Sequence, residues 1–202
     1  MAVVEHDGTQ SVLIFDINSE PILSRGEILR LKYGGLTLSE RQSLLEQLLE
    51  RNAESWVRGY QDGLNGSFVD LGAHFVDRHA PDIPLRPNLE GRAINGANPR
   101  TGALPRAGNL RGNPSSQFAD WRTFMAILNE ATSRTSRGLS EFNHAMQNGG
   151  MAVTGTGGRV IGRGFFPNRR DPSQPTFEPE LYNWIVPFDG NSGKPYSAYP
   201  TR

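Results

Sequence analysis

Two histidines and an arginine lie within six positions of this chain, in the stretch His74-Phe75-Val76-Asp77-Arg78-His79. An imidazole titrates near neutral pH, so it can take up or release a proton during a reaction. A guanidinium group is permanently charged and donates paired hydrogen bonds to phosphate. The stretch therefore has the residue types of an acid–base site that acts on an anion. The structural alternative is that His74 is a half-buried histidine and Arg78 its solvated neighbour.

We expect this stretch to be helical because Ser67-Phe68-Val69-Asp70 has the spacing of a capping box. In such a helix His74 and Arg78 lie one turn apart on the same face. His79 would point about 140° away from His74, at about 100° per residue. Either the helix ends near Arg78, or only one of the two histidines is functional.

The composition limits the function classes. The chain has 202 residues, enough for one medium domain or a small domain with an extension. It has no cysteine, which excludes disulfide bonds, a thiolate nucleophile and a cysteine-based zinc site. We find no signal-like segment at the start and no long apolar run, so we expect no membrane-spanning segment.

The net charge of zero hides an uneven distribution of charge. Residues 1–66 have 6 Lys+Arg and 10 Asp+Glu, a balance of −4, whereas residues 67–202 have 15 and 11, a balance of +4. Only Lys32 and Lys194 are lysines, so the basic portion is rich in arginine. Such a portion indicates nucleic acid or another polyanion as a partner. The base composition of the gene is the other explanation for the arginine.

The remaining sequence predicts the elements that position this stretch. A helix is expected from about 38 to 62 behind the capping box Thr37-Leu38-Ser39-Glu40, and a core helix from Phe118 to Ala131 behind Ser115 and Ser116. The proline- and arginine-rich segment 80–114 has no period, so we expect a long loop. Further expectations are a strand at 11–16, helices at 26–33 and 139–147, a hairpin across 151–165, and strands at 181–188 and 194–199.

Helices followed by antiparallel strands are the pattern of an α+β fold. The run Gly63-Leu64-Asn65-Gly66 ends the long helix, and the charge balance changes sign there. We therefore divide the chain into a helical N-terminal extension, residues 1–66, and a functional domain, residues 67–202. The extension would serve delivery, entry or partner binding. In the last strand, alternation places Ser197 and Tyr199 on one side and Tyr196 on the other.

Four features occur in order along the second part of the chain. They are His74-x-x-x-Arg78-His79, Ser115-Ser116-Gln117-Phe118, the strand 158–164, and the ending Tyr196-Ser197-Ala198-Tyr199-Pro200-Thr201. Together they resemble the RNase A-like toxin domain at the C-termini of bacterial contact-dependent growth inhibition proteins and related polymorphic toxins. The resemblance covers roughly residues 70–202 and leaves residues 1–66 uncovered.

The resemblance implies a kidney-shaped α+β domain that cleaves RNA without metal or other cofactor, and a cognate immunity protein that neutralises it in interbacterial competition. It also implies delivery from a producing bacterium, secreted or at its surface, into the cytoplasm of a target cell. The family's histidine corresponds to the pair His74 and His79, and its final Thr-x-Tyr pair to Ser197 and Tyr199. Serine in place of threonine keeps the hydroxyl group and loses a methyl group.

The arginine of the family corresponds to Arg78, Arg86 or Arg92, because the long loop leaves the register open. We take Arg78 and Arg86 as candidates for catalysis. We take three further basic residues, Arg92, Arg163 and Lys194, as candidates for binding the substrate.

Cleavage of RNA by transphosphorylation needs a base for the 2′-OH proton, an acid for the 5′-oxygen, and donors to the charged phosphoryl group. Histidines suit both proton roles, and arginine with the hydroxyls of Ser197 and Tyr199 suits the phosphate. If only one histidine acts, Tyr199 is the candidate for the second proton carrier, although its reference pKa of about 10 makes it a poor base.

Three other functions remain open on the sequence. A non-catalytic module would use the helix bearing Trp56 and the arginine-rich loop to bind a protein or polyanion. A toxin with another reaction, such as ADP-ribosyl transfer, is the second. A metalloenzyme has the least support, because His74 and His79 are five positions apart, which is wrong for one helical face, and no third ligand is evident.

Overall fold

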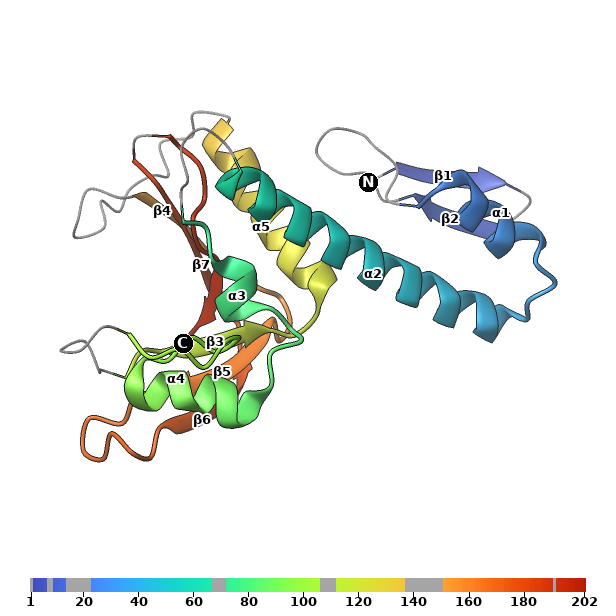
Figure 1. Cartoon of the computed structure of the whole chain (residues 1–202). Coiled ribbons are helices and arrows are strands. Elements are labelled where there is room, and N and C mark those ends of the chain that lie inside the picture. Colours follow the sequence, from blue (N-terminus) through green and yellow to red (C-terminus); the bar gives the residue numbers. More distant parts are fainter. Residues whose placement is uncertain are drawn as a thin grey trace.

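The structure is a computed structural model of the whole chain, and it describes residues 2–6, 9–13, 23–66, 72–105, 112–136, 151–190 and 192–202. The chain has a mixed α+β fold in which helices precede two small antiparallel sheets (Figure 1), which confirms the predicted class. The Ser67 cap and the helix expected at 139–147, with His144, lie outside the described residues. In chain order the elements are β1 (Ala2–His6), β2 (Thr9–Leu13), α1 (Arg25–Tyr33), α2 (Leu38–Asn65), α3 (Phe75–His79), the π-helical turn η1 (Leu85–Leu89), α4 (Glu90–Asn95), β3 (Ser115–Phe118), α5 (Trp121–Ser136), β4 (Met151–Thr156), β5 (Gly162–Phe166), β6 (Thr176–Leu181), β7 (Asn183–Phe188) and β8 (Tyr199–Thr201).

Helix α2 begins where the sequence predicts. The Thr37 Oγ1 atom accepts a hydrogen bond from the Glu40 amide at 3.3 Å, and the Glu40 carboxylate accepts one from the Thr37 amide at 2.8 Å. This capping box satisfies two amide groups that no helical carbonyl reaches. The helix continues to Asn65, and α1 has a capping box of the same kind at Ser24 and Glu27.

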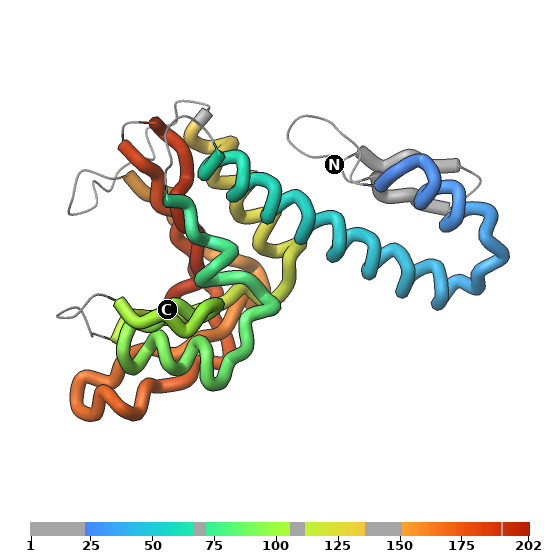
Figure 2. Tube along the Cα trace, viewed as in Figure 1, coloured from blue at the N-terminus to red at the C-terminus, as the bar shows by residue number. Residues whose placement is uncertain are grey.

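The two ends of α2 belong to different apolar clusters. Its first half packs on α1 through Leu48 and Leu49. Its second half contributes Ala53, Val57 and Leu64 to the main core, which also contains α5 and both sheets. The first half of α2 and α1 stand away from the two three-stranded sheets in Figures 1 and 2. The main core therefore crosses the division predicted at residue 66, because the second half of α2 packs along α5.

The C-terminal strands form two three-stranded sheets. In the first, β5 lies between β3 and β6, and in the second, β7 lies between β4 and β8. The hairpin expected across 151–165 is therefore wrong, because β4 pairs with β7 and β5 pairs with β3 and β6. The run expected as one strand at 181–188 is divided at Tyr182 between β6 and β7.

The Ser115–Phe118 segment, which the sequence suggested as a helix cap, is the strand β3 instead. All four residues are buried, and β3 is paired with β5. Long-range pairing thus decides the conformation of a segment whose serines locally favour a cap. The core helix α5 begins three residues later than expected, where the Asp120 carboxylate accepts a hydrogen bond from the Thr123 amide at 2.6 Å.

The segment 80–114 is more ordered than its composition suggests. It contains η1 and α4, so the described part of it is not one long loop. Asp82 accepts hydrogen bonds from Arg58 of α2 and from Arg100, both at 2.8 Å. The ion pair with Arg58 holds the segment against α2, and the pair with Arg100 joins two parts of the segment to each other; the sequence gives no periodic signal for such contacts.

The two sheets meet beside the end of the chain. The Ser116 hydroxyl on β3 donates to the Pro200 carbonyl on β8 at 2.6 Å. A side chain at Gly162 would overlap the Gln117 carbonyl and the Pro200 ring, so glycine is required for this approach. Residues 194–198 are not a regular strand, and the alternation predicted for Ser197 and Tyr199 does not apply to them.

Candidate functional site

Both histidines of the 74–79 stretch lie at the ends of one short helix. Helix α3 has five residues, with His74 as its N-cap and His79 as its last residue. The N-cap backbone of His74 is not helical, with φ −142° and ψ 21°. The angular separation expected for a continuous helix therefore does not hold, and the His74 imidazole lies close enough to His79 to lower the pKa of His79.

Main-chain carbonyls fix the orientation of both imidazoles. The His74 Nδ1 atom lies 2.8 Å from the Gly72 carbonyl, and the His79 Nδ1 atom lies 2.7 Å from the Ser116 carbonyl. A carbonyl only accepts hydrogen bonds, so Nδ1 carries the proton in each neutral ring. Each Nε2 atom then has a lone pair, which is the arrangement that a general base needs.

Burial keeps both histidines neutral. Burial, with smaller contributions from the charges of Arg92, His74 and Arg78, lowers the pKa of His79 to about 3, although the hydrogen bond to the Ser116 carbonyl acts to raise it. Burial also lowers the pKa of His74, again with Arg78 and Arg92 as nearby positive charges. His79 is 5% exposed and His74 is half-buried, so His74 is the one that water reaches more easily.

Two arginines lie beside the histidines. Burial and the charge of Arg78 lower the pKa of Arg92 to about 10, and burial lowers the pKa of Arg78 despite the nearby Asp77 carboxylate. The Arg92 Nε atom is buried without a hydrogen-bond partner, and no described residue forms an ion pair with Arg92. Burying a cation next to a second cation raises the free energy of the folded chain, and a bound anion would offset this unfavourable term.

Aromatic rings from the end of the chain complete the cluster. The Tyr199 ring lies 5.3 Å from the His79 ring, and the Tyr196 ring lies 6.2 Å from the His74 ring, between centroids. A main-chain hydrogen bond also links the two segments, because the His74 amide donates to the Tyr196 carbonyl at 3.2 Å. We call these six residues the histidine–arginine cluster: His74, Arg78, His79, Arg92, Tyr196 and Tyr199.

Four other residues predicted for the site lie outside the histidine–arginine cluster. The Arg86 side chain is 71% exposed and forms an ion pair with Glu90 at 3.2 Å. Ser197 is buried, without a hydrogen bond to the cluster among the described side chains. Arg163 and Lys194 are exposed and have no recorded contact with the cluster. The structure thus joins Arg78 and Arg92 to the histidines and leaves Arg86 outside.

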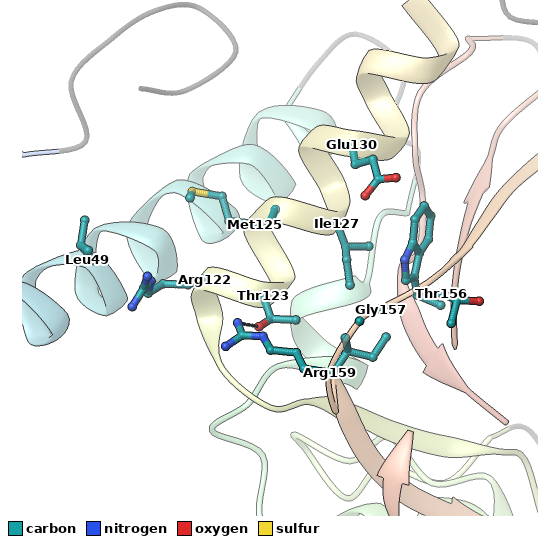
Figure 3. A pocket seen from close by; sticks show the side chains of 13 residues that line it. Leu49, Arg122, Thr123, Met125, Ile127, Glu130, Thr156, Gly157 and Arg159 are labelled. Atoms are coloured by element: carbon teal, nitrogen blue, oxygen red, sulfur yellow. Dashed lines mark hydrogen bonds between the residues drawn. The ribbon is translucent and has the colours of Figure 1, made fainter. Parts of the chain in front are cut away.

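The described residues contain no group of three or more histidine or acidic side chains placed to hold a metal ion. A pocket of about 420 Å³ lies elsewhere, between α5 and the connection from β4 to β5, with Leu49, Arg122, Glu130 and Arg159 among its lining residues (Figure 3). No residue of the histidine–arginine cluster lines it. We place the candidate site at the histidine–arginine cluster, because the side chains that can transfer protons and bind an anion are in the cluster and not in the pocket.

The chain was compared with family models, with curated proteins and with solved structures. None of the three comparisons found a match. In the described part of the chain no helix is both long and apolar enough to cross a membrane.

Side-chain hydrogen bonds from α2 fix the position of α3, the helix that carries the histidines. The Gln61 Oε1 atom accepts a buried hydrogen bond from the Val76 amide at 2.7 Å, and its Nε2 atom donates to Asp77 at 3.2 Å. Gln61 is not among the residues that the sequence predicts for the site. A signal was present, since Gln61 lies four residues after Val57 and three before Leu64, within the apolar stripe of α2. A glutamine in such a stripe indicates a buried polar contact.

Replacing Gln61 with leucine is expected to lower the free energy of unfolding by about 1–3 kcal/mol, because the Val76 amide would be buried without an acceptor. Urea denaturation measures this loss. Gln47→Leu is the matched control on the same helix, since Gln47 is exposed, and it should change stability by less than about 0.5 kcal/mol. Equal effects of the two substitutions would show that the Gln61 contact does not stabilise α3.

Stability is expected to fall in acid because of His79. The unfolded histidine has a pKa of about 6.5 and the folded one about 3, so between these values the unfolded chain binds a proton that the folded chain does not. At pH 5 this costs about 2 kcal/mol relative to pH 7, at about 1.4 kcal/mol per pH unit below 6.5. Above pH 6.5 the group contributes no slope.

The measurement is urea denaturation of the wild-type chain and His79→Asn between pH 7 and pH 5. Asparagine keeps a donor near the position of Nδ1 and removes the titration. The variant should lose about 2 kcal/mol less than the wild type over this range. Parallel curves would show that His79 binds its proton in the folded chain as readily as in the unfolded one.

Proposed function

We propose that the chain is a metal-independent endoribonuclease that cleaves RNA by transphosphorylation at the histidine–arginine cluster. One observation carries the proposal. Two histidines with carbonyl-bound Nδ1 atoms adjoin two half-buried arginines, one of which has a buried, unpartnered Nε atom. Proton carriers beside an uncompensated positive charge are suited to a phosphodiester, which must be held and also deprotonated at its neighbouring 2′-OH.

The reaction assigns one role to each group. The base takes the proton of the 2′-OH, the 2′-oxygen attacks phosphorus, and the bond from phosphorus to the 5′-oxygen breaks. The acid gives a proton to that 5′-oxygen, so the products are a 2′,3′-cyclic phosphate and a 5′-OH end. Arg78 and Arg92 donate to the non-bridging oxygens, on which negative charge increases in the transition state.

We assign the base to His79 and the acid to His74. Burial lowers the pKa of His79 to about 3 in the free chain, so its ring is neutral and its Nε2 lone pair can accept a proton; the charge of a bound phosphate raises this pKa toward the range that a base needs. His74 is more exposed, and a bound phosphate beside it raises its pKa, which allows it to carry a proton. Tyr199 packs on the His79 ring, and its hydroxyl is a further donor to phosphate.

Incubation of the purified chain with total bacterial RNA in EDTA tests the proposal. The wild type should produce fragments with 2′,3′-cyclic phosphate ends, and His74→Asn/His79→Asn should leave the RNA intact. RNA that stays intact with both proteins, although the wild type binds it in a salt-dependent manner, would favour the alternative of a polyanion-binding module.

The toxin role, the immunity protein and the delivery into a target cell rest on the resemblance to contact-dependent toxins and on the proposed RNA cleavage. Induced production of the chain inside a laboratory bacterium should stop growth, and the double histidine variant should not. Normal growth with undiminished amounts of active wild-type enzyme would refute the toxin role while leaving the ribonuclease proposal in place.

A further inference from the structure

The Tyr196 ring belongs to the histidine–arginine cluster and has no part in the chemistry described above. Its centroid lies 6.2 Å from that of His74, at an interplanar angle of 55°. It is also close enough to Tyr199 for its charge to raise the pKa of that residue, after the larger effect of burial. Tyr196 therefore lies beside the position where the reacting phosphate would be held.

The main chain fixes the position of Tyr196. Its carbonyl accepts the hydrogen bond of the His74 amide at 3.2 Å, and its own amide donates to the Pro187 carbonyl at 3.1 Å. These bonds involve no side-chain atom of Tyr196, so they hold the residue whatever its side chain is. The main chain thus holds the backbone of Tyr196 beside the proposed acid, and the ring projects from that fixed point.

The ring is not used for packing the core. Trp56 and Tyr60 are partly buried aromatic residues that pack against the main apolar cluster, and among the described residues Tyr196 is not in that group. Its side chain is half-buried, whereas the neighbouring Ser197 and Ala198 are buried. A partly open aromatic ring next to a cationic site has a surface available for a ligand.

We infer that the Tyr196 ring stacks on a nucleobase of single-stranded RNA, next to the phosphate held by Arg78 and Arg92. This inference rests on the proposed ribonuclease function. Proteins that bind single strands combine a positively charged surface for the backbone with aromatic rings on which bases stack. Stacking tolerates any base, because every base has a π face, and it requires a base that is not paired in a duplex.

The inference makes Tyr196 a substrate-binding residue and not a proton carrier. Its ring should contribute to affinity, and its hydroxyl should contribute little. Removing one stacked ring typically weakens binding of a single strand about tenfold. Tyr196→Phe, which keeps the ring, should bind within about twofold of the wild type.

The experiment measures binding of the full chain to a 20-nucleotide RNA of mixed sequence in which every sugar is 2′-O-methylated, so that no cleavage occurs. The proteins are the wild type, Tyr196→Ala, Tyr196→Phe and the matched control Tyr182→Ala. Tyr182 is 42% exposed and hydrogen-bonded to Glu180 at 2.9 Å. We expect a loss of about tenfold for Tyr196→Ala alone.

A strand of the same length without bases separates stacking from a structural effect. It keeps the phosphates, so the wild type and Tyr196→Ala should bind it equally. An equal loss on both strands would show that the alanine disturbs the site, and it would overturn the inference. Wild-type affinity of Tyr196→Ala for the complete strand would also overturn the inference. A loss of affinity for Tyr196→Phe equal to that for Tyr196→Ala would overturn it too, because the effect would then belong to the hydroxyl group.

Failure of this inference differs from failure of the proposed function. A wild type that cuts RNA while Tyr196→Ala binds the methylated strand normally would refute stacking and retain the ribonuclease. A wild type that neither cuts RNA nor binds the methylated strand would refute both.

Discussion

Replacing His79 with asparagine is expected to lower the rate of RNA cleavage about 10²- to 10⁴-fold, the range for loss of a general base. Asparagine can still donate to the Ser116 carbonyl, as the His79 Nδ1 atom does at 2.7 Å, so the loss should reflect proton transfer and not orientation. His74→Asn should cause a loss of similar size on RNA. The measurement is kcat/KM on a fluorescent oligoribonucleotide.

A substrate with a good leaving group separates the two histidines. A ribonucleoside 3′-(4-nitrophenyl phosphate) still needs a base at its 2′-OH, but nitrophenolate leaves without a proton. His79→Asn should lose activity on it as on RNA, whereas His74→Asn should retain most of its activity. The reverse pattern would exchange the two roles, and undiminished activity of both variants on RNA would remove the histidines from the mechanism.

Replacing Arg92 with methionine is expected to change activity and stability in opposite directions. Cleavage should fall about 10²- to 10³-fold, since a donor to the charged phosphoryl group is lost. The free energy of unfolding should rise, on the order of 1 kcal/mol, because the substitution removes a half-buried charge that has no ion-pair partner among the described residues. Most substitutions at half-buried positions destabilise, so a gain would be diagnostic.

Arg86→Met is the matched control, since Arg86 is 71% exposed and lies outside the cluster. It should change cleavage by less than about threefold and stability by less than about 0.5 kcal/mol. Inorganic phosphate should raise the melting temperature of the wild type and of Arg86→Met, and have little effect on Arg92→Met. Equal activity losses for the two arginine variants would contradict the assignment of Arg92 to the phosphate.

Local signals in the sequence predicted the two longest helices well, although they gave no indication of α4. The Thr37 and Glu40 capping box starts α2 as expected, and the apolar spacing behind Phe118 predicts α5. Long-range pairing decided the strands, and the sequence predicted it poorly. Whether β4 pairs with β5 or with β7 depends on contacts between residues about thirty positions apart, such as Val153 and Val186, which no local period records.

The candidate site was predicted in its residue types and only partly in its geometry. The stretch from His74 to His79 indicated acid–base chemistry, but the shortness of α3 and the non-helical His74 were needed to relate the two imidazoles. The choice among three arginines was open because the sequence shows no sign of α4, which carries Arg92. Tyr196 was assigned to the opposite side from Tyr199 by an alternation that only a regular strand would have.

The proposed mechanism requires the histidine–arginine cluster to perform 2′-OH chemistry on a phosphodiester. Its most direct test is a set of four DNA strands, each with a single ribonucleotide that carries a different base, incubated with the wild-type chain in EDTA. We predict cleavage only on the 3′ side of the ribonucleotide in at least one strand, leaving a 2′,3′-cyclic phosphate. Cleavage of an all-deoxy strand, or cleavage of RNA that requires a divalent cation, would contradict the account.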